Sequence, residues 1–223
     1  MVGLYYLGIF VIMGFSLWAQ FKVKGTFKKY SKVPNSLGIT GAQFVAEAAS
    51  KLGIKLQVRQ SSGLLTDYFD PRKDIISLSP EVYNGTSISS LGVAAHELGH
   101  AIQKKEKYFW MWVRSLLVPI VPVGTYLGYV LIILGLIINA LGLAELGLAL
   151  FALMVVFTGI TLPVEFDASK RALKLLHEFG LPQDEVKGVK KVLTAAALTY
   201  VAAFVSALWD FMYFALMVFG RKD

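Results

Sequence analysis

Residues 110–163 read WMWVRSLLVPIVPVGTYLGYVLIILGLIINALGLAELGLALFALMVVFTGITLP, and their only charged side chains are Arg114 and Glu145. A helix that crosses a bilayer needs roughly 20 predominantly apolar residues. The stretch is long enough for two such helices, which we place near residues 114–137 and 145–163. Asn139 and Gly142 favour a tight turn over residues 139–143 between them.

Two other stretches of the chain have the same apolar character. Residues 3–21 carry no charge and would span about 28 Å as a helix. A cleaved signal peptide is the alternative here, but no basic segment precedes the stretch, and Phe-Lys-Val-Lys rather than a small-residue cleavage site ends it. Residues 192–219 carry one charge, Asp210, which we expect near the outer end of this helix in a structural role. The sequence therefore predicts four membrane-spanning helices.

The composition agrees with a membrane protein. Of the 223 residues, 56% are hydrophobic, against roughly 45–50% in soluble domains, which excludes an ordinary soluble domain. The chain has no cysteine, which excludes a disulfide framework, cysteine-ligated zinc, an iron–sulfur cluster and a cysteine nucleophile. Its three histidines are His96, His100 and His177, and we expect the last on a helix surface.

The net charge of the chain is +7, and its basic residues cluster beside the predicted spans. Basic residues favour the cytoplasmic side of a membrane, and they attract anionic lipid head groups. All of the basic clusters face the cytoplasm if the N-terminus is outside, so we place residues 22–109 and 164–191 there. The charge therefore requires no nucleic-acid partner. The clusters are Lys22, Lys24, Lys28, Lys29, Lys32; Lys104, Lys105, Lys107, Arg114; and Lys170, Arg171, Lys174, Lys187, Lys190, Lys191.

The water-facing region over residues 22–109 has a mixed α and β pattern. Thr40 can cap a helix over residues 41–52, and a second helix begins near Ser87 or Ser89 and runs to about Lys107. Residues 54–59 and 74–79 have the pattern of short strands. We therefore expect a mostly α multi-pass membrane protein with a small α+β cytoplasmic part, which the metal-binding motif of the second helix, described next, makes zincin-like.

The second helix carries the motif HELGH at residues 96–100, an HExxH pattern. Residues four apart leave a helix on nearly the same face, so His96 and His100 can bind one metal ion. Zinc accepts imidazole nitrogens, and a catalytic site keeps one position for water. Glu97 can then act as general base toward a zinc-activated water. The alternative is a pair of buried structural histidines with a capping glutamate.

Two histidines leave a zinc site incomplete, so a third ligand is expected from elsewhere in the chain. Glu165 follows the third span on the same side of the membrane, where Pro163 suits the first turn of a new helix that Gly180 and Pro182 end. We predict Glu165 as this ligand; the alternative is an acid that the helix dipole favours. Asp167 and Ser169 are candidates to orient a histidine through its other ring nitrogen.

These motifs resemble the YugP-like family of membrane zinc metallopeptidases, and more distantly the HtpX-type membrane proteases. The resemblance rests on AHELGHAIQ at residues 95–103 with EFDAS at 165–169, and also on DYFDP at 67–71, LSPEVY at 78–83 and LTYV at 198–201. It implies His96, His100 and Glu165 as zinc ligands and Glu97 as general base and acid. Ser169 departs from the HtpX pattern, which usually has Asp there.

Two further roles are predicted within this site. Peptidases of this kind bind substrate as an added strand on a sheet edge, and the segment Ile75, Ile76, Ser77 and Leu78 is our candidate edge, although an ordinary internal strand fits it equally. Tyr200, near the cytoplasmic end of the last span, can donate to the oxyanion of the reaction. A tyrosine of the membrane interface is the alternative reading of Tyr200.

The sequence thus predicts a zinc metalloendopeptidase whose active site faces the cytoplasm and whose substrates are proteins or peptides near the bilayer, membrane proteins among them. An intramembrane zinc protease and a non-enzymatic membrane scaffold with a structural metal are the alternatives, and a protein partner or homo-oligomer stays open. The predicted organisation is a first span over 1–21, a cytoplasmic region with the HExxH helix over 22–109, two spans within 110–163, cytoplasmic helices over 164–191, and a last span with its tail over 192–223.

Overall fold

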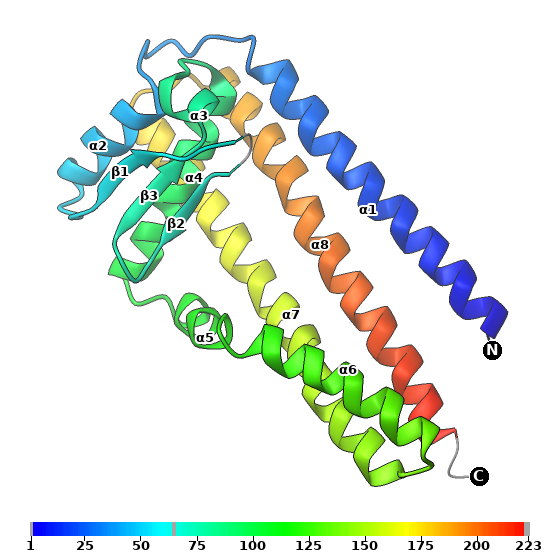
Figure 1. The fold of residues 1–223 in the computed structure, drawn as a ribbon. Helices are drawn as coiled ribbons and strands as arrows, with labels where there is room; N and C mark the ends of the chain where they lie inside the picture. The colour runs from blue at the N-terminus through cyan, green and yellow to red at the C-terminus, as the bar shows by residue number, and fades with distance from the viewer. Residues whose placement is uncertain (1, 64–65, 221–223) are drawn as a thin grey trace. The chain divides into compact units, whose positions relative to one another are not determined.

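A computed structural model describes residues 2–63 and 66–220, which form eight α-helices and three β-strands (Figure 1). The chain divides into two compact units. The helical unit comprises the chain up to Trp18, Trp112–Pro163 and the chain from Thr199, and the α+β unit comprises Ala19–Met111 and Val164–Leu198. The mostly helical character and the small sheet agree with the predicted fold class.

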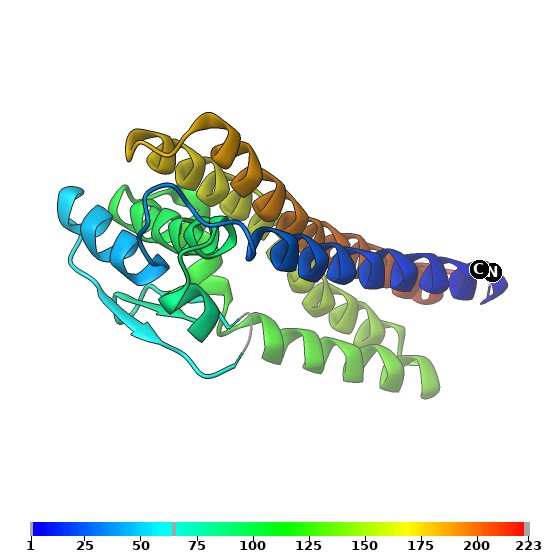
Figure 2. The ribbon, with the colours of Figure 1, turned by 90° about the horizontal axis from the view of Figure 1, so that it is seen from above.

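The long helices α1 (Val2–Tyr30), α7 (Leu141–Glu178) and α8 (Gln183–Phe219) contribute to both units. All three are long and apolar enough to cross a membrane. Within the helical unit, α1 runs beside α8 in both views (Figures 1 and 2), and the Tyr5 ring stacks on Tyr213 with ring centroids 3.4 Å apart. The Tyr5 hydroxyl also donates to Asp210 on α8. The structural role of Asp210 stays a prediction.

The predicted helix over residues 114–137 is broken in the structure. Two helices, α5 (Phe109–Leu117) and α6 (Val121–Ile137), meet there with a bend of 54°. Pro119 and Pro122 explain the break, because proline lacks an N–H group and disfavours helical conformation in the residue before it. The described residues therefore hold three candidate spans, or four if α5 and α6 together count as one.

Helices α6 and α7 are joined by a turn that overlaps the predicted one but begins one residue earlier and ends sooner. The turn occupies residues 138–140, and Asn139 takes a left-handed conformation with φ of 55°. Asparagine tolerates this conformation better than most side chains. Gly142, expected in the turn, lies inside α7 instead. A β-carbon on Gly128 would lie 2.7 Å from the Gly147 carbonyl oxygen, so α6 and α7 pack with their backbones close together.

Helix α7 does not restart at Pro163, and the prediction of a new helix there is wrong. It continues through the proline to Glu178. Proline occurs inside long apolar helices more readily than in other helices, and the stretch before Pro163 is apolar. Consequently Glu165 belongs to the same continuous helix as the apolar stretch before Pro163. His177 is exposed in the last turn of α7, as predicted.

The α+β unit contains helices α2 (Gly41–Lys51), α3 (Pro80–Asn84) and α4 (Ile88–Lys105) and strands β1 (Gln57–Gln60), β2 (Tyr68–Asp70) and β3 (Ile75–Leu78). The predicted helices are confirmed: Thr40 forms a capping box at α2, and Ser87 caps α4. The strand over 74–79 is confirmed as β3, and the strand over 54–59 is shifted to β1. The short strand β2 and helix α3 were not predicted.

The prediction that Ile75–Leu78 forms a sheet edge is wrong. The strand order is β1-β3-β2, so β3 is the central strand, parallel to β1 and antiparallel to β2. The four predicted edge residues Ile75, Ile76, Ser77 and Leu78 are all buried. Neighbouring strands pair with both edges of β3, and Ile76 and Leu78 also belong to the buried core cluster of this unit. Without the unpredicted strand β2, strand β3 would have been an edge strand, as predicted.

The core of the α+β unit lies around α4. Phe44 of α2, Ile76 of β3, Leu91 and Leu98 of α4 and Leu176 of α7 are completely buried in one cluster. Apolar side chains from the sheet and from α2 and α7 therefore hold α4 in place. One face of α4 is left to carry the polar residues described next.

Candidate metal centre

The two histidines of the HExxH motif lie one turn apart on α4. Their ring centroids are 4.7 Å apart and the ring planes are nearly perpendicular. His100 is buried, and His96 is partly buried. Because α4 is an uninterrupted helix from Ile88 to Lys105, its periodicity puts both rings on one face, as the motif spacing predicted.

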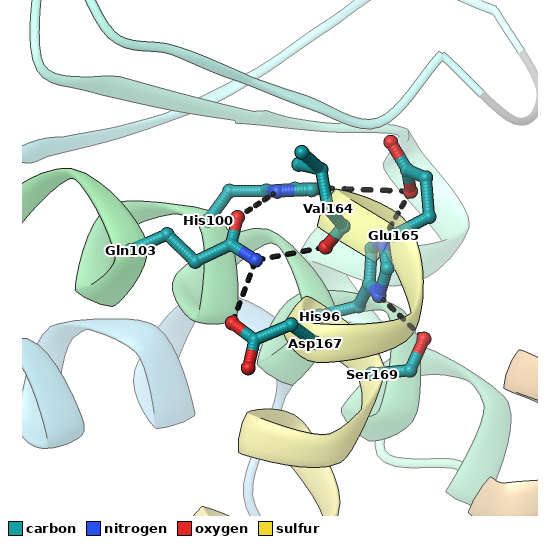
Figure 3. Close-up of polar contacts among 7 residues, drawn as sticks. All are labelled: His96, His100, Gln103, Val164, Glu165, Asp167 and Ser169. Atoms are coloured by element: carbon teal, nitrogen blue, oxygen red, sulfur yellow. Dashed lines mark hydrogen bonds and ion pairs between the residues drawn. The ribbon is translucent and has the colours of Figure 1, made fainter. Parts of the chain in front are cut away.

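Glu165 from α7 lies against these two rings (Figure 3). Its Oε2 atom is 3.1 Å from Nε2 of His96 and 3.6 Å from Nε2 of His100. One ligand atom from each of the three residues can be chosen so that all lie within 4.8 Å of one another. The structure thus brings three side chains together, although His96 and Glu165 are 69 residues apart in the sequence.

A glycine allows this approach of α7 to α4. A β-carbon on Gly99 would lie 2.5 Å from the carbonyl oxygen of Ala168 and 3.2 Å from its Cα. Backbone atoms cannot rotate away as a side chain can, so a larger residue at this position would push the helices apart. Gly99 stands between the two histidines, and Ala168 is one turn after Glu165, so this close backbone contact of the two helices lies at the site itself.

Glu165 is a buried carboxylate whose charge is matched by its neighbours. It is only 1% exposed and lies two residues beyond the apolar stretch that ends at Pro163. Burial raises the pKa of Glu165, but when His100 and His96 carry a proton on Nε2, their hydrogen bonds and charge outweigh that effect and hold the pKa well below its usual value. The side chain is therefore ionised at neutral pH, as a metal ligand must be.

The donor set fits zinc. Two imidazole nitrogens and one carboxylate oxygen are the ligand types that catalytic zinc sites use, with a fourth position left for water or substrate. The burial of His100 and Glu165 also fits, because two bases and a carboxylate facing each other out of water are stabilised by a cation between them. His96, His100 and Glu165 can therefore hold a metal ion.

Each histidine uses its second ring nitrogen for a further hydrogen bond. Ser169 Oγ lies 3.2 Å from Nδ1 of His96, and Oε1 of Gln103 lies 3.0 Å from Nδ1 of His100. Asp167, the other predicted orienting residue, contacts Gln103 at 2.9 Å rather than a histidine. Partners of this kind set the ring orientation and the position of the ring proton.

Sequence reasoning did not find Gln103. It lies one turn after His100 on α4, and its side chain is completely buried. A polar residue three positions after a ligand on the same helix face was the available signal.

Of the two predicted catalytic residues, Glu97 is next to His96 on α4 and 7% exposed. Tyr200 lies on α8 in the helical unit, and its contribution to the reaction stays a prediction.

Comparison with known proteins agrees with the chemistry of this site. The family model described as "Putative neutral zinc metallopeptidase" matches residues 5–219. The chain is 42% identical over 213 residues to the "Putative membrane protease YugP" of Bacillus subtilis (strain 168), and the alignment covers 95% of each chain. No solved structure matches the chain.

Proposed function

The chain belongs to the family described as "Putative neutral zinc metallopeptidase", and on this premise we propose that it is a zinc metalloendopeptidase of the cell membrane that hydrolyses peptide bonds at the cytoplasmic surface. The observation that carries the proposal is the convergence of His96, His100 and Glu165 from two helices onto one position. These three side chains would hold the metal. The family and the relative named a membrane protease support the reaction class.

The remaining chemistry belongs to residues of this chain. Bound zinc would act as a Lewis acid that polarises the scissile carbonyl and lowers the pKa of a water molecule. Glu97, adjacent to His96 on the same helix, would take a proton from the attacking water and return it to the leaving amine. Tyr200 is a candidate donor to the negative charge that develops on the substrate carbonyl oxygen.

The substrates would be proteins or peptides close to the bilayer. Glu165 lies two residues after Pro163 on the continuous helix α7, a rise of about 3 Å beyond the apolar stretch. A ligand this near the end of an apolar helix favours a site at the membrane surface, where unfolded segments and membrane proteins are within reach. Helix α4, which carries both histidines, is not among the candidate spans of the described residues, and this argues against an intramembrane protease.

The decisive test of the reaction uses purified full-length protein in detergent, elemental analysis for zinc, and unfolded casein as substrate. Glu97→Gln should abolish cleavage and keep zinc, because the ligands are intact and only the base is lost. Glu47→Gln, an exposed change on α2, is the matched control and should alter neither. Cleavage by the Glu97→Gln protein would contradict the mechanism. Zinc without cleavage in the wild type would favour the scaffold alternative.

The third ligand is tested in the same protein. Glu165→Ala should lose zinc during gel filtration, because two histidines alone hold the ion weakly. Asp167→Ala should retain zinc, because Asp167 contacts Gln103 rather than the ligand position. Loss of zinc from the Asp167→Ala protein but not from the Glu165→Ala protein would reverse the assignment.

We place the N-terminus outside and the α+β unit in the cytoplasm, with α1, the α5–α6 pair, α7 and α8 as spans. The support is the basic residues in the C-terminal part of α1 and just after it, together with those around the α7–α8 connection. The chain has no cysteine, so single introduced cysteines report their side of the membrane cleanly. An impermeant maleimide on intact cells should label Gly142→Cys but not Lys73→Cys, both exposed positions. The opposite labelling would overturn the orientation.

A further inference from the structure

Gln103 is a completely buried amide between α4 and α7, and every polar atom of its side chain has a partner. Its Oε1 lies 3.0 Å from Nδ1 of His100, and its Nε2 lies 2.8 Å from the carbonyl oxygen of Val164 and 2.9 Å from Oδ2 of Asp167 (Figure 3). We propose that Gln103 is a positioning residue that fixes the proton of His100 on Nδ1, and that Asp167 and Arg171 act on His100 through Gln103.

The surroundings allow only one orientation of the Gln103 amide. The carbonyl of Val164 and the carboxylate of Asp167 are both acceptors, so the group that faces them must be the amide nitrogen with its two N–H donors. The reverse orientation would put an oxygen within 3 Å of two other oxygens and bury all of them without a proton between them. Oε1 of Gln103 therefore faces His100.

The orientation of the amide determines the tautomer of His100. Oε1 can only accept, so the hydrogen bond to His100 exists only when Nδ1 carries the proton. A neutral imidazole has one proton, which leaves Nε2 of His100 with a free lone pair. This is the nitrogen that faces Glu165 Oε2, at 3.6 Å. The lone pair is thus directed at the position that the proposed function assigns to zinc, and this part of the inference rests on that proposal.

Asp167 and Arg171 hold the amide from the other side. Nε of Arg171 donates to Oδ2 of Asp167, the same oxygen that accepts from Gln103. Another nitrogen of Arg171 donates to Glu106, the C-cap residue of α4. The charge of Asp167 is therefore balanced, and its position is tied to both helices. A salt-bridged carboxylate is a fixed acceptor, which is what the Gln103 orientation requires.

His96 provides an internal comparison. Its Nδ1 faces the hydroxyl of Ser169 at 3.2 Å, and a hydroxyl can either donate or accept. Ser169 is therefore compatible with either tautomer of His96, whereas Gln103 is compatible with one tautomer of His100. In the metal-free protein, the ring proton of His100 should therefore be confined to one nitrogen more strictly than the ring proton of His96.

Long-range ¹H–¹⁵N spectra of the full-length chain in detergent, with histidine labelled and zinc removed by a chelator, test the tautomer directly. The chain has three histidines, so His96→Ala and His177→Ala variants assign the signals of His100. We expect the His100 proton on Nδ1 in the wild type and a shift toward Nε2 in Gln103→Met. A wild-type His100 with its proton on Nε2 would overturn the proposal. The proposed peptidase function would remain, because this measurement involves neither zinc nor substrate.

Zinc affinity, measured by competition with a chromophoric chelator, tests the path through Gln103. Gln103→Met should weaken zinc binding about 10- to 100-fold, as loss of a ligand's orienting partner does. Asp167→Ala and Arg171→Met should weaken zinc binding less than Gln103→Met does. When either change is added to the Gln103→Met protein, zinc affinity should fall no further. Gln20→Met, an exposed change on α1, is the matched control and should leave affinity unchanged. Equal effects of Asp167→Ala in both backgrounds would show that Asp167 does not act through Gln103.

If Gln103→Met does not yield folded protein by circular dichroism, the wild-type spectrum and the Asp167→Ala protein still decide the matter. Asp167→Ala should shift part of the His100 proton to Nε2, because Gln103 then keeps only the Val164 carbonyl as acceptor. An unchanged His100 spectrum in the Asp167→Ala protein would refute the role of Asp167.

Discussion

The contact between Gly99 and Ala168 makes a sharp prediction for the Gly99→Ala protein. The added β-carbon would lie 2.5 Å from the Ala168 carbonyl oxygen, where ordinary contacts begin at 3.4 Å. Both partners are backbone atoms within helices, so α4 and α7 must separate by about 0.9 Å, the difference between these distances. Glu165 lies one turn before Ala168 on α7 and would move by a similar amount away from the two histidines.

The consequence should be much larger for zinc than for stability. Alanine in place of glycine in a helix interior gains about 0.5–1 kcal/mol, and overpacking costs about 1–3 kcal/mol, so the free energy of unfolding should fall by only about 0–2.5 kcal/mol. Zinc–ligand distances are held within about 0.2 Å, which is several times smaller than the displacement of Glu165. We therefore expect zinc affinity to fall by about 10- to 100-fold or more.

The assay is a chelator competition for zinc together with thermal unfolding followed by circular dichroism. Gly25→Ala is the matched control, because Gly25 lies inside α1 and a β-carbon there would meet no atom within 4 Å. The control should keep its zinc affinity and gain slightly in stability. A folded Gly99→Ala protein whose zinc affinity stays within about twofold of the wild type would refute the argument that close backbone packing sets the ligand geometry.

Two further predictions concern the α+β unit away from the metal. Burial raises the pKa of Asp67 despite hydrogen bonds from the backbone and hydroxyl of Ser79. The stability that Asp67 contributes is thus present below its unfolded pKa of about 4 and is lost as the pH rises through the raised folded value. As the pH rises above about 4, the Asp67→Asn protein should therefore lose less stability than the wild type in thermal melts, and parallel curves would contradict this. Thr40→Ala removes the capping box of α2 and should lower the free energy of unfolding by about 0.5–2 kcal/mol in denaturant titrations, while a change below about 0.3 kcal/mol would mean that the cap is dispensable.

Local sequence rules predicted the parts of the fold that depend on neighbours in the chain. Helix α2 begins at its Thr40 cap, α4 begins at Ser87, and β3 occupies the segment predicted as a strand. The turn between α6 and α7 also overlaps the predicted one. Caps and turn residues act over three or four positions, so the sequence contains the information that they need.

The errors have a shared physical origin in context beyond the local sequence. Pro163 was expected to begin a helix, yet α7 is a long apolar helix before this residue and continues through it. Residues 75–78 were expected at a sheet edge, but the three-residue strand β2 pairs with them. Whether β3 is an edge follows from which strands come to lie beside it, and strand order depends on contacts between distant segments.

The kind of site could be predicted from the sequence, because helical periodicity alone lets HExxH place two imidazoles on one helix face. Glu165 was predicted as the third ligand, and the structure places it close enough to both histidines to share a metal ion with them. The packing of α7 against α4 places Asp167 on Gln103 instead of on a histidine, and it brings Ala168 against Gly99. Periodicity relates residues within one helix, as it relates Gln103 to His100, whereas these two contacts join residues more than sixty positions apart in the chain. Such contacts depend on how the helices pack, which no local pattern specifies.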